Sequence, residues 1–438
     1  MSTARRGILA SVFFLFSRTL GAQISMPATS PGRTLTIDEA VHEALERNLD
    51  LIADKYNLSV ADARIITAKL RPNPVVSVGA DHLDLLGTSY SELNNAGPSE
   101  YSIRTDFLLE RGQKRASRIA VAQGSRSVVE LQLLNSARTL VLDVRNSYVE
   151  ALLARENLAL AQENLKSFGD IVDVNRKRVK SGDLAEVELF RTELAQLQFE
   201  NAVRQSMARL RTARTKLQLL LGRTNSGALV DVTGQLRMAA EPVDQEELVK
   251  SALKLRPDLR GIQQDQSRSS ADLRLQIAQG KIDYTVGTEY RRQQGLAGRG
   301  SSLGVFFSTN IPVFNKNQGE IERARQEQRQ IEARIRALTA TIQTDVETAY
   351  MQYANALTAL QRLEGTMLAK ARDVRQITEF SYRLGEATLI ELLDAQRAYN
   401  ETMQSYNEAR AEITDLEKKA KLNDSNSFVK WSYSSIKI

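Results

Sequence analysis

The 438-residue sequence contains no cysteine and only two histidines. Without cysteine the chain forms no disulfide, no thiolate metal site, no thiol nucleophile and no lipid anchor on an N-terminal cysteine. Two histidines are too few for a histidine-rich metal site. Aromatic residues make up only 6% of the chain and proline only 8 residues, whereas alanine, leucine, glutamate, glutamine and arginine dominate after residue 110. That composition is typical of long helices.

Catalytic motifs are missing from the sequence as well. Gly-rich phosphate loops are absent, and His42-Glu43 lacks the second histidine of a metalloprotease helix. We therefore predict that the chain is not an enzyme and uses no metal or other cofactor. The net charge of +6 is small for this length, and segments such as 320–325 mix acidic and basic residues. This mixture is typical of a solvated helix face, so no nucleic-acid partner is predicted.

The N-terminus has the pattern of an export signal. Arg5 and Arg6 precede an apolar run at 8–16, and the small residues Gly21 and Ala22 follow. This order predicts a secretory signal peptide at 1–22. The apolar run is too short for a retained membrane anchor, and no later segment has the ~18 consecutive apolar residues of a transmembrane helix. We expect an exported protein.

The rest of the chain is one unit written twice. Residues 44–51 are matched by 252–259, and residues 178–189 are matched by 381–392 at a nearly constant offset. Each half has a first helix after a capping residue, two short alternating segments, a very long helix, a glycine-containing turn and a return helix. The predicted chain begins with a signal peptide at 1–22. A first repeat follows at 34–222, with strands at about 74–83 and 101–110 and a helical hairpin at 113–221, and a linker at 223–243 comes after it. The second repeat covers 244–420, with strands at about 282–292 and 301–311 and a helical hairpin at 317–420, and a polar tail follows at 421–438.

The long helices are too long for a compact domain. Segments 113–170 and 317–380 contain no proline, and their apolar residues recur at a spacing of three to four. At ~1.5 Å per residue such helices reach roughly 85–95 Å. Each then reverses at a turn that contains Gly182 or Gly385.

The alternating segments favour a membrane barrel. In 101–110, residues Tyr101, Ile103 and Phe107 fall on one face, opposite Ser102 and Arg104. Segments of about ten residues with this alternation suit a lipid-facing barrel with a wet lumen. An ordinary half-buried sheet packed on helices has the same pattern. Export, and the isolation of two hairpins within helical sequence, favour the barrel.

The number of strands indicates an oligomer. A sheet that spans lipid must close, because its edge groups find no water there. The four predicted strands of one chain cannot close a barrel, whereas two copies supply about 8 strands and three supply about 12 with room for a passage. Three copies are favoured.

Three motifs carry a resemblance to a known family. They are the turn at 382–388 running into 390–395, its weaker copy around Gly182, and the strand-to-helix junction at 311–319, which is paired with 107–113. Because the three motifs occur in this order within a duplicated chain, the sequence resembles the TolC-like outer-membrane efflux proteins over both halves. The junction at 311–319 looks most like the heavy-metal cation (CzcC-like) branch.

The resemblance implies a mainly helical subunit with a membrane β-barrel portion. Three copies would form a 12-stranded barrel in the outer membrane and a helical tube across the periplasm. The resemblance also implies two partners, a periplasmic membrane-fusion adaptor and an inner-membrane pump of the RND type. The function that it implies is that of a passive conduit for metal cations or small toxic compounds. The alternative is an exported periplasmic coiled-coil structural or adaptor protein. That alternative explains the helices and the signal peptide but not the four amphipathic strands.

The family pattern assigns an entrance to the second hairpin. Glu391 and Asp394 fall where the family has acidic residues at the periplasmic entrance, and threefold symmetry would make each a carboxylate ring. Alternatively, both are exposed helix residues paired with neighbours such as Arg397.

The turn before these carboxylates completes the expected gate. Tyr382 matches a family position that holds the tip closed. Ala387 replaces a basic partner found in some members, and Arg383 is the candidate substitute. Gly182 and Gly385 serve the tight turns, and their surroundings are candidates for adaptor contact.

Overall fold

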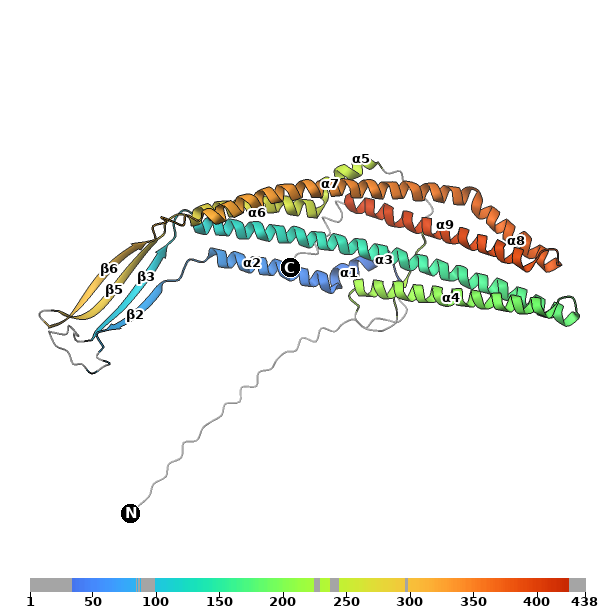
Figure 1. Cartoon of the computed structure of the whole chain (residues 1–438), viewed down its shortest axis with the longest axis horizontal. Coiled ribbons are helices and arrows are strands. Elements are labelled where there is room, and N and C mark those ends of the chain that lie inside the picture. Colours follow the sequence, from blue (N-terminus) through green and yellow to red (C-terminus); the bar gives the residue numbers. More distant parts are fainter. Residues whose placement is uncertain are drawn as a thin grey trace, which may run out of the picture.

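The computed structural model describes residues 34–83, 85, 87, 99–223, 229–236, 244–295 and 298–424. The described chain is a long rod, with a four-stranded sheet at one end and the turns of two helical hairpins at the other (Figure 1). The predicted signal peptide at 1–22 lies outside the described residues, as do parts of the predicted linker and tail.

The two halves of the chain contain the same elements in the same order. The first repeat consists of α1 (Ile37–Arg47), α2 (Leu49–Lys69), β2 (Val75–Asp81), β3 (Glu100–Leu109), α3 (Lys114–Ser181) and α4 (Glu186–Leu220). The second consists of α5 (Gln245–Leu255), α6 (Pro257–Gln279), β5 (Tyr284–Gly295), β6 (Gly298–Thr309), α7 (Gln318–Arg362), the π-helical turn η1 (Leu363–Met367), α8 (Leu368–Leu384) and α9 (Leu389–Asp424). The prediction of a mainly helical chain with tandem repeats is confirmed.

The start of each repeat differs from the expected single helix. Thr36 begins α1 with a capping box: its hydroxyl accepts from the Glu39 N–H at 3.3 Å, and the Glu39 carboxylate accepts from the Thr36 N–H at 2.9 Å. Asn48 then ends α1, and its side chain caps α2 through the Leu51 N–H at 3.0 Å. Pro257 produces the corresponding break, because proline is well suited to the first position of α6.

The sheet joins the two repeats. Its strand order is β2-β3-β5-β6 and each neighbouring pair is antiparallel. The central pair β3–β5 links the first repeat to the second, with Ile103 opposite Tyr290 and Phe107 opposite Val286. In the described part of the chain, the outer edges of β2 and β6 have no strand partner.

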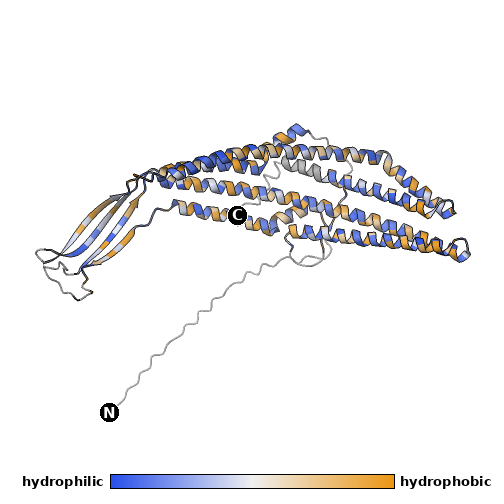
Figure 2. Cartoon of the chain, in the orientation of Figure 1, coloured by the Kyte–Doolittle hydropathy of each residue, from blue (hydrophilic) through white to orange (hydrophobic). Residues whose placement is uncertain are grey.

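The register gives the sheet one apolar face and one polar face. Apolar side chains alternate with polar or small ones along the strands (Figure 2). The apolar face contains Val76, Val78, Ile103, Phe107, Val286, Tyr290, Leu303, Val305 and Phe307, and most of these are exposed. None of the described helices covers that face in Figure 1, so the ordinary half-buried sheet is disfavoured.

The main hydrophobic core lies halfway along the rod, around α3. A short parallel pair, β1 (Thr34–Leu35) with β4 (Asp231–Val232), packs there. The Tyr148 hydroxyl of α3 donates to the Leu35 carbonyl at 2.8 Å and also contacts the Thr233 carbonyl. The predicted linker at 223–243 therefore contains a strand of its own. At the other end of the chain, α9 continues to Asp424, into the segment expected to be a polar tail.

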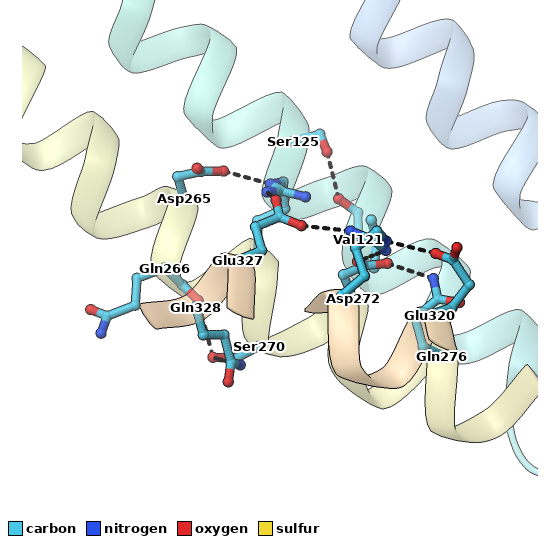
Figure 3. A network of polar contacts seen from close by, with 12 residues as sticks. Val121, Ser125, Asp265, Gln266, Ser270, Asp272, Gln276, Glu320, Glu327 and Gln328 are labelled. Carbon is cyan, nitrogen blue, oxygen red and sulfur yellow. Dashed lines mark hydrogen bonds and ion pairs between the residues drawn. The ribbon is translucent and has the colours of Figure 1, made fainter. Parts of the chain in front are cut away.

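Charged residues hold α6 and α7 together close to the sheet (Figure 3). Arg268 of α6 bonds Asp265 at 2.5 Å and Glu327 of α7 at 2.7 Å. Arg323 of α7 bonds Asp272 of α6 at 2.8 Å, and its hydrogen bond with Glu320, followed by that with Asp272, raises the guanidinium pKa. This network accounts for Glu320 and Arg323 of the mixed-charge segment 320–325, whereas Glu322 and Arg325 pair with each other on the exposed face.

The long helix of the second repeat is interrupted, whereas that of the first is not. The π-helical turn η1 separates α7 from α8, and the helix bends between these two segments in Figure 1. Such turns are a recognised cause of helix kinks. The Tyr406 hydroxyl of α9 donates to the Glu364 carboxylate within this turn at 3.2 Å. None of the described helices combines the length and apolar character that crossing a bilayer requires.

Buried amides connect α3 of the first repeat to α9 of the second. The Asn164 side chain donates to Asn400 at 2.8 Å and accepts from Gln396 at 2.9 Å. Seven residues away on each helix, Asn407 donates to Asn157 at 3.1 Å. A polar side chain in an otherwise apolar seam fixes the register of two packed helices, because any slip leaves it unpaired.

We predict that Asn164→Ala lowers the free energy of unfolding by about 1–3 kcal/mol, because Gln396 and Asn400 lose a buried partner. Guanidinium unfolding of the detergent-solubilised protein, followed by far-UV circular dichroism, measures this change. Asn201→Ala is the control, since Asn201 is exposed on α4. Equal stability losses in the two variants would contradict a role for the amides in the seam.

Candidate functional site

The two hairpin turns have the same backbone geometry. Gly182 ends α3 with φ of 86°, and Gly385 ends α8 with φ of 85°. Their N–H groups bond the carbonyls of the preceding turn, for example that of Tyr382 at 3.0 Å. Only glycine adopts this left-handed conformation without strain, so the turns account for both residues.

Tyr382 connects the second hairpin to the first. Its side chain is 7% exposed, and its hydroxyl accepts from the Asn175 amide of α3 at 2.7 Å. The same amide lies 3.2 Å from the Thr192 hydroxyl of α4. Burial raises the pKa of the Tyr382 hydroxyl, which therefore stays protonated at neutral pH.

Apolar packing surrounds this polar contact. The cluster draws on three helices and on the start of α9, and it consists of Phe168, Ile171, Val172, Ala195, Tyr382, Leu389 and Leu392. Because residues of both hairpins share one cluster, the described chain holds its two tips together. The Tyr382 contact therefore lies between hairpins of one copy.

Arg383 does not take part in the contact between the hairpins as described. Its guanidinium bonds Glu379 of the same helix at 2.6 Å. A different arginine approaches the second turn: the Arg178 guanidinium of α3 lies 3.2 Å from the position that a Cβ at Gly385 would occupy. Arg178 is thus the basic residue that the first hairpin places beside this turn.

Glu391 has a structural task at the start of α9. Its carboxylate accepts from the Thr388 N–H at 2.6 Å and from the Thr388 hydroxyl at 2.9 Å, and the hydroxyl accepts from the Glu391 N–H at 3.3 Å. These bonds form a capping box. The backbone bond, followed by the hydroxyl bond, lowers the pKa of Glu391, so its carboxylate is ionised at neutral pH.

Asp394 lies one turn further along α9 and is exposed. Its carboxylate lies 3.6 Å from the Arg397 guanidinium, and both side chains are mostly open to solvent. In the first repeat, Glu188 and Arg191 occupy the positions of Glu391 and Asp394, and they bond each other at 2.7 Å. The second hairpin therefore carries the more loosely held carboxylate.

Sequence reasoning did not identify Asn175, Arg178 or Thr192 as partners of the second tip. The signal available was weak: Asn175 lies in the apolar seam of α3, where an amide needs a partner. Which hairpin supplies that partner depends on how the two repeats pack. That packing is a long-range property.

The junction between sheet and helices also contains an ion pair that connects the repeats. Lys114, at the start of α3, is 6% exposed, and its ammonium bonds the Asp283 carboxylate at 2.6 Å and the Lys281 carbonyl at 2.8 Å. The Arg111 N–H donates to the same carboxylate at 2.8 Å. These contacts fix the direction in which β5 leaves the helices.

This arrangement defines a class of protein. An amphipathic sheet with two open edges lies at one end, and paired helical tips lie at the other, at the far end of long helices. Among the described residues, no group of three or more histidines or carboxylates could hold a metal ion. The architecture is that of an elongated component of a membrane channel.

The family follows from comparison with known proteins. The model of the outer membrane efflux protein family matches residues 40–223 and 248–418, one segment in each repeat. The chain belongs to the outer membrane efflux protein family.

Two curated relatives align over most of the chain. It is 22% identical to the cobalt-zinc-cadmium resistance protein CzcC of Cupriavidus metallidurans over 365 residues, 83% of each chain. It is 24% identical to the pyoverdine export outer membrane protein OpmQ of Pseudomonas putida over 418 residues, which are 87% of this chain and 83% of OpmQ.

Solved structures show the same fold. CusC, described in terms of transmembrane channel formation, aligns with a TM-score of 0.67 at 18% identity over 90% of this chain and 95% of CusC. The Campylobacter jejuni CmeC outer membrane channel aligns with a TM-score of 0.68 at 13% identity over 99% of this chain and 98% of CmeC.

The chain is therefore an outer-membrane efflux channel component that extends into the periplasm. Channels of this family work with an adaptor and an inner-membrane pump in tripartite systems. The family and fold are those of channel proteins rather than enzymes. The alternative of a periplasmic coiled-coil adaptor is set aside.

We predict that Tyr382→Phe loosens the contact between the two tips, because the Asn175 amide loses one of its two acceptors, the one on the second hairpin, at a cost of about 0.5–1.5 kcal/mol in each copy. The mean conductance of the protein in planar bilayers should rise. Tyr56→Phe serves as the control, since Tyr56 is 68% exposed on α2. Unchanged conductance in the Tyr382 variant would contradict a closing role for this hydroxyl.

Proposed function

We propose that three copies of the chain close into one 12-stranded barrel and one helical tube. The support lies in the open edges of β2 and β6. With alternating strand directions, β6 of one copy can continue antiparallel to β2 of the next. Three such sheets leave room for a passage, whereas two give an interior filled by side chains.

Exposed apolar stripes on the helices support the same assembly. On α4 the stripe consists of Val187, Phe190, Leu194 and Leu197, each more than half exposed. On α8 it consists of Val374, Ile377, Phe380 and Leu384, also more than half exposed. Both follow helical spacing and lie near the tips. We propose that the α4 stripe of one copy packs on the α8 stripe of its neighbour, which removes both from water.

The periplasmic entrance is proposed to lie at the second hairpin. Glu391 and Asp394 then form two carboxylate rings, and Tyr382 holds the tips together while the entrance is closed. Arg383 is kept as an entrance residue, exposed beside the turn and paired with Glu379. The capping role of Glu391 is compatible with a ring, because the capped carboxylate stays ionised and the residue is exposed.

The tips are proposed as the adaptor contact. Gly182 and Gly385 keep both turns compact, and the exposed residues around them are the part of the rod furthest from the sheet. The inner-membrane partner is proposed to be a proton-driven pump of the RND type. This proposal rests on the resemblance of the junction at 311–319 to the heavy-metal branch.

The cargo is proposed to be a metal cation or a small toxic compound. Similarity to the cobalt-zinc-cadmium resistance protein supports the first. Similarity to a pyoverdine export protein supports an organic cargo. The conduit is passive: it needs a lumen of suitable width and charge rather than a binding site.

We predict that Glu391→Gln with Asp394→Asn reduces the preference of the channel for potassium over chloride, because two rings of negative charge are neutralised. The amide that replaces the Glu391 carboxylate can still accept from Thr388, so the cap is retained while the charge is removed. The measurement is the reversal potential in planar bilayers under a potassium chloride gradient.

The matched control for the entrance variant is Glu246→Gln with Glu247→Gln, two exposed carboxylates on α5 that lie far from both ends. We expect no change in selectivity there. A normal reversal potential in the entrance variant would remove these carboxylates from the conduction path.

We predict that a strain lacking this gene is sensitised to cobalt, zinc or cadmium ions rather than to a panel of organic compounds. Growth inhibition across both panels, with the intact gene restored as control, distinguishes the two classes of cargo. Sensitisation to organic compounds alone would overturn the metal assignment and leave the channel function in place.

A further inference from the structure

The polar face of the sheet carries a network of charges. On β3, the Arg104 guanidinium lies 2.9 Å from the Asp106 carboxylate. On β5, the Arg291 guanidinium lies 2.8 Å from the Glu289 carboxylate, and it also lies 3.6 Å from Glu100 of β3. The register sets Arg104 directly opposite Glu289. The charges of the two repeats therefore meet across the central strand pair.

Aromatic and glycine residues fit around this network. The guanidinium carbon of Arg104 lies 4.4 Å from the centre of the Phe306 ring of β6, within cation–π range. Phe306 is opposite Gly287, which in turn is opposite Asp106. A Cβ at Gly287 would lie only 2.1 Å from the Asp106 carboxylate. The absence of a side chain there lets the large groups of the neighbouring strands β3 and β6 lean over β5.

The network is held in place by the sheet alone. Glu289 is 7% exposed although none of the described helices covers the sheet. Its burial comes from neighbouring side chains on the same face, such as Arg291. Side chains fixed in this way present their charges at set positions, whereas long solvated side chains move freely.

The described part of this face has an excess of negative charge. The register assigns four carboxylates to it, those of Asp81, Glu100, Asp106 and Glu289, against the two guanidinium groups of Arg104 and Arg291. The opposite face carries the exposed apolar side chains and therefore faces lipid in the proposed barrel. The charged face then lines the lumen.

We propose that this network, Arg104–Asp106–Phe306 with Glu289–Arg291–Glu100, is a selectivity layer of the barrel, separate from the periplasmic entrance. This inference rests on the proposed three-copy barrel. Three sheets arrange the layer as a girdle of fixed charges with a negative sum, which raises the local concentration of cations and lowers that of anions. The barrel therefore discriminates by charge even when the entrance is open.

The decisive test uses substitutions of opposite sign within the layer. Asp106→Asn with Glu289→Gln removes negative charge, and Arg104→Gln removes positive charge. We expect the permeability ratio of potassium to chloride to fall in the first variant and to rise in the second. Each change should be about twofold or more, the Boltzmann factor for one unit charge about 8 Å from an ion in water.

Both variants are measured in planar bilayers beside the wild type and beside Glu246→Gln with Glu247→Gln on α5. Both are also combined with Glu391→Gln and Asp394→Asn, because separate layers should change the ratio additively on a logarithmic scale. Heat-modifiable trimers on gels confirm assembly. If a layer variant does not assemble, Glu100→Gln and Arg291→Gln repeat the same two signs at neighbouring positions.

The outcomes separate the two levels of inference. A wild-type chain that forms neither a heat-modifiable trimer nor a conducting pore overturns the proposed function. A conducting trimer whose permeability ratio stays the same in the layer variants, or moves in the same direction for both signs, overturns only the selectivity layer. Opposite shifts support it.

Discussion

The open edges of the four-stranded sheet are the constraint on which the rest of the molecule depends. In the described chain, β2 and β6 each present backbone groups without a strand partner on the outer side, and lipid offers no water to satisfy them. Each such group costs several kcal/mol in hydrocarbon. In the assembly that we propose, neighbouring copies pair with these edges, and the apolar stripes of α4 and α8 pack on the same neighbours further along the rod. The β3–β5 ladder and the buried Lys114–Asp283 pair join the two repeats, so that the open edges of β2 and β6 lie on opposite sides of one sheet.

The duplication has kept the frame and changed the surfaces. Both repeats have a short helix pair, a hairpin of strands and a helical hairpin that turns at a left-handed glycine. The first repeat has an unbroken α3, and the polar residues of its tip pair with one another, as Glu188 does with Arg191. The second has a π-helical turn, a capped α9 and a tyrosine that reaches into the first hairpin. The proposed gate at the second tip uses both features, since the bend permits motion and the interhairpin hydrogen bond opposes it.

Local pattern was sufficient to predict the strands, the long helices and the turns. Alternation along 101–110 predicted β3 almost to its ends, and the glycines at 182 and 385 marked the reversals. The break at Asn48, the π-helical turn and the capping box of Glu391 were not predicted, because each is set by a competition among a few local hydrogen bonds. The contact of Tyr382 with Asn175 was inaccessible for a different reason. It joins residues of different repeats, and a sequence period does not say which helix faces which.

The polar side chains along the rod fall into two sets. Some bond partners within the chain, and others are open to solvent or to a passing solute. The arginines between α6 and α7 have their carboxylates at hand, and the amides between α3 and α9 bond one another. Loosely held carboxylates occur instead near the tips, and an excess of carboxylates occurs on the polar face of the sheet. A passive conduit does not bind its cargo tightly, because tight binding slows release. In the channel that we propose, fixed charge at the tips and in the barrel is consistent with that requirement, because it selects ions by sign without holding them tightly.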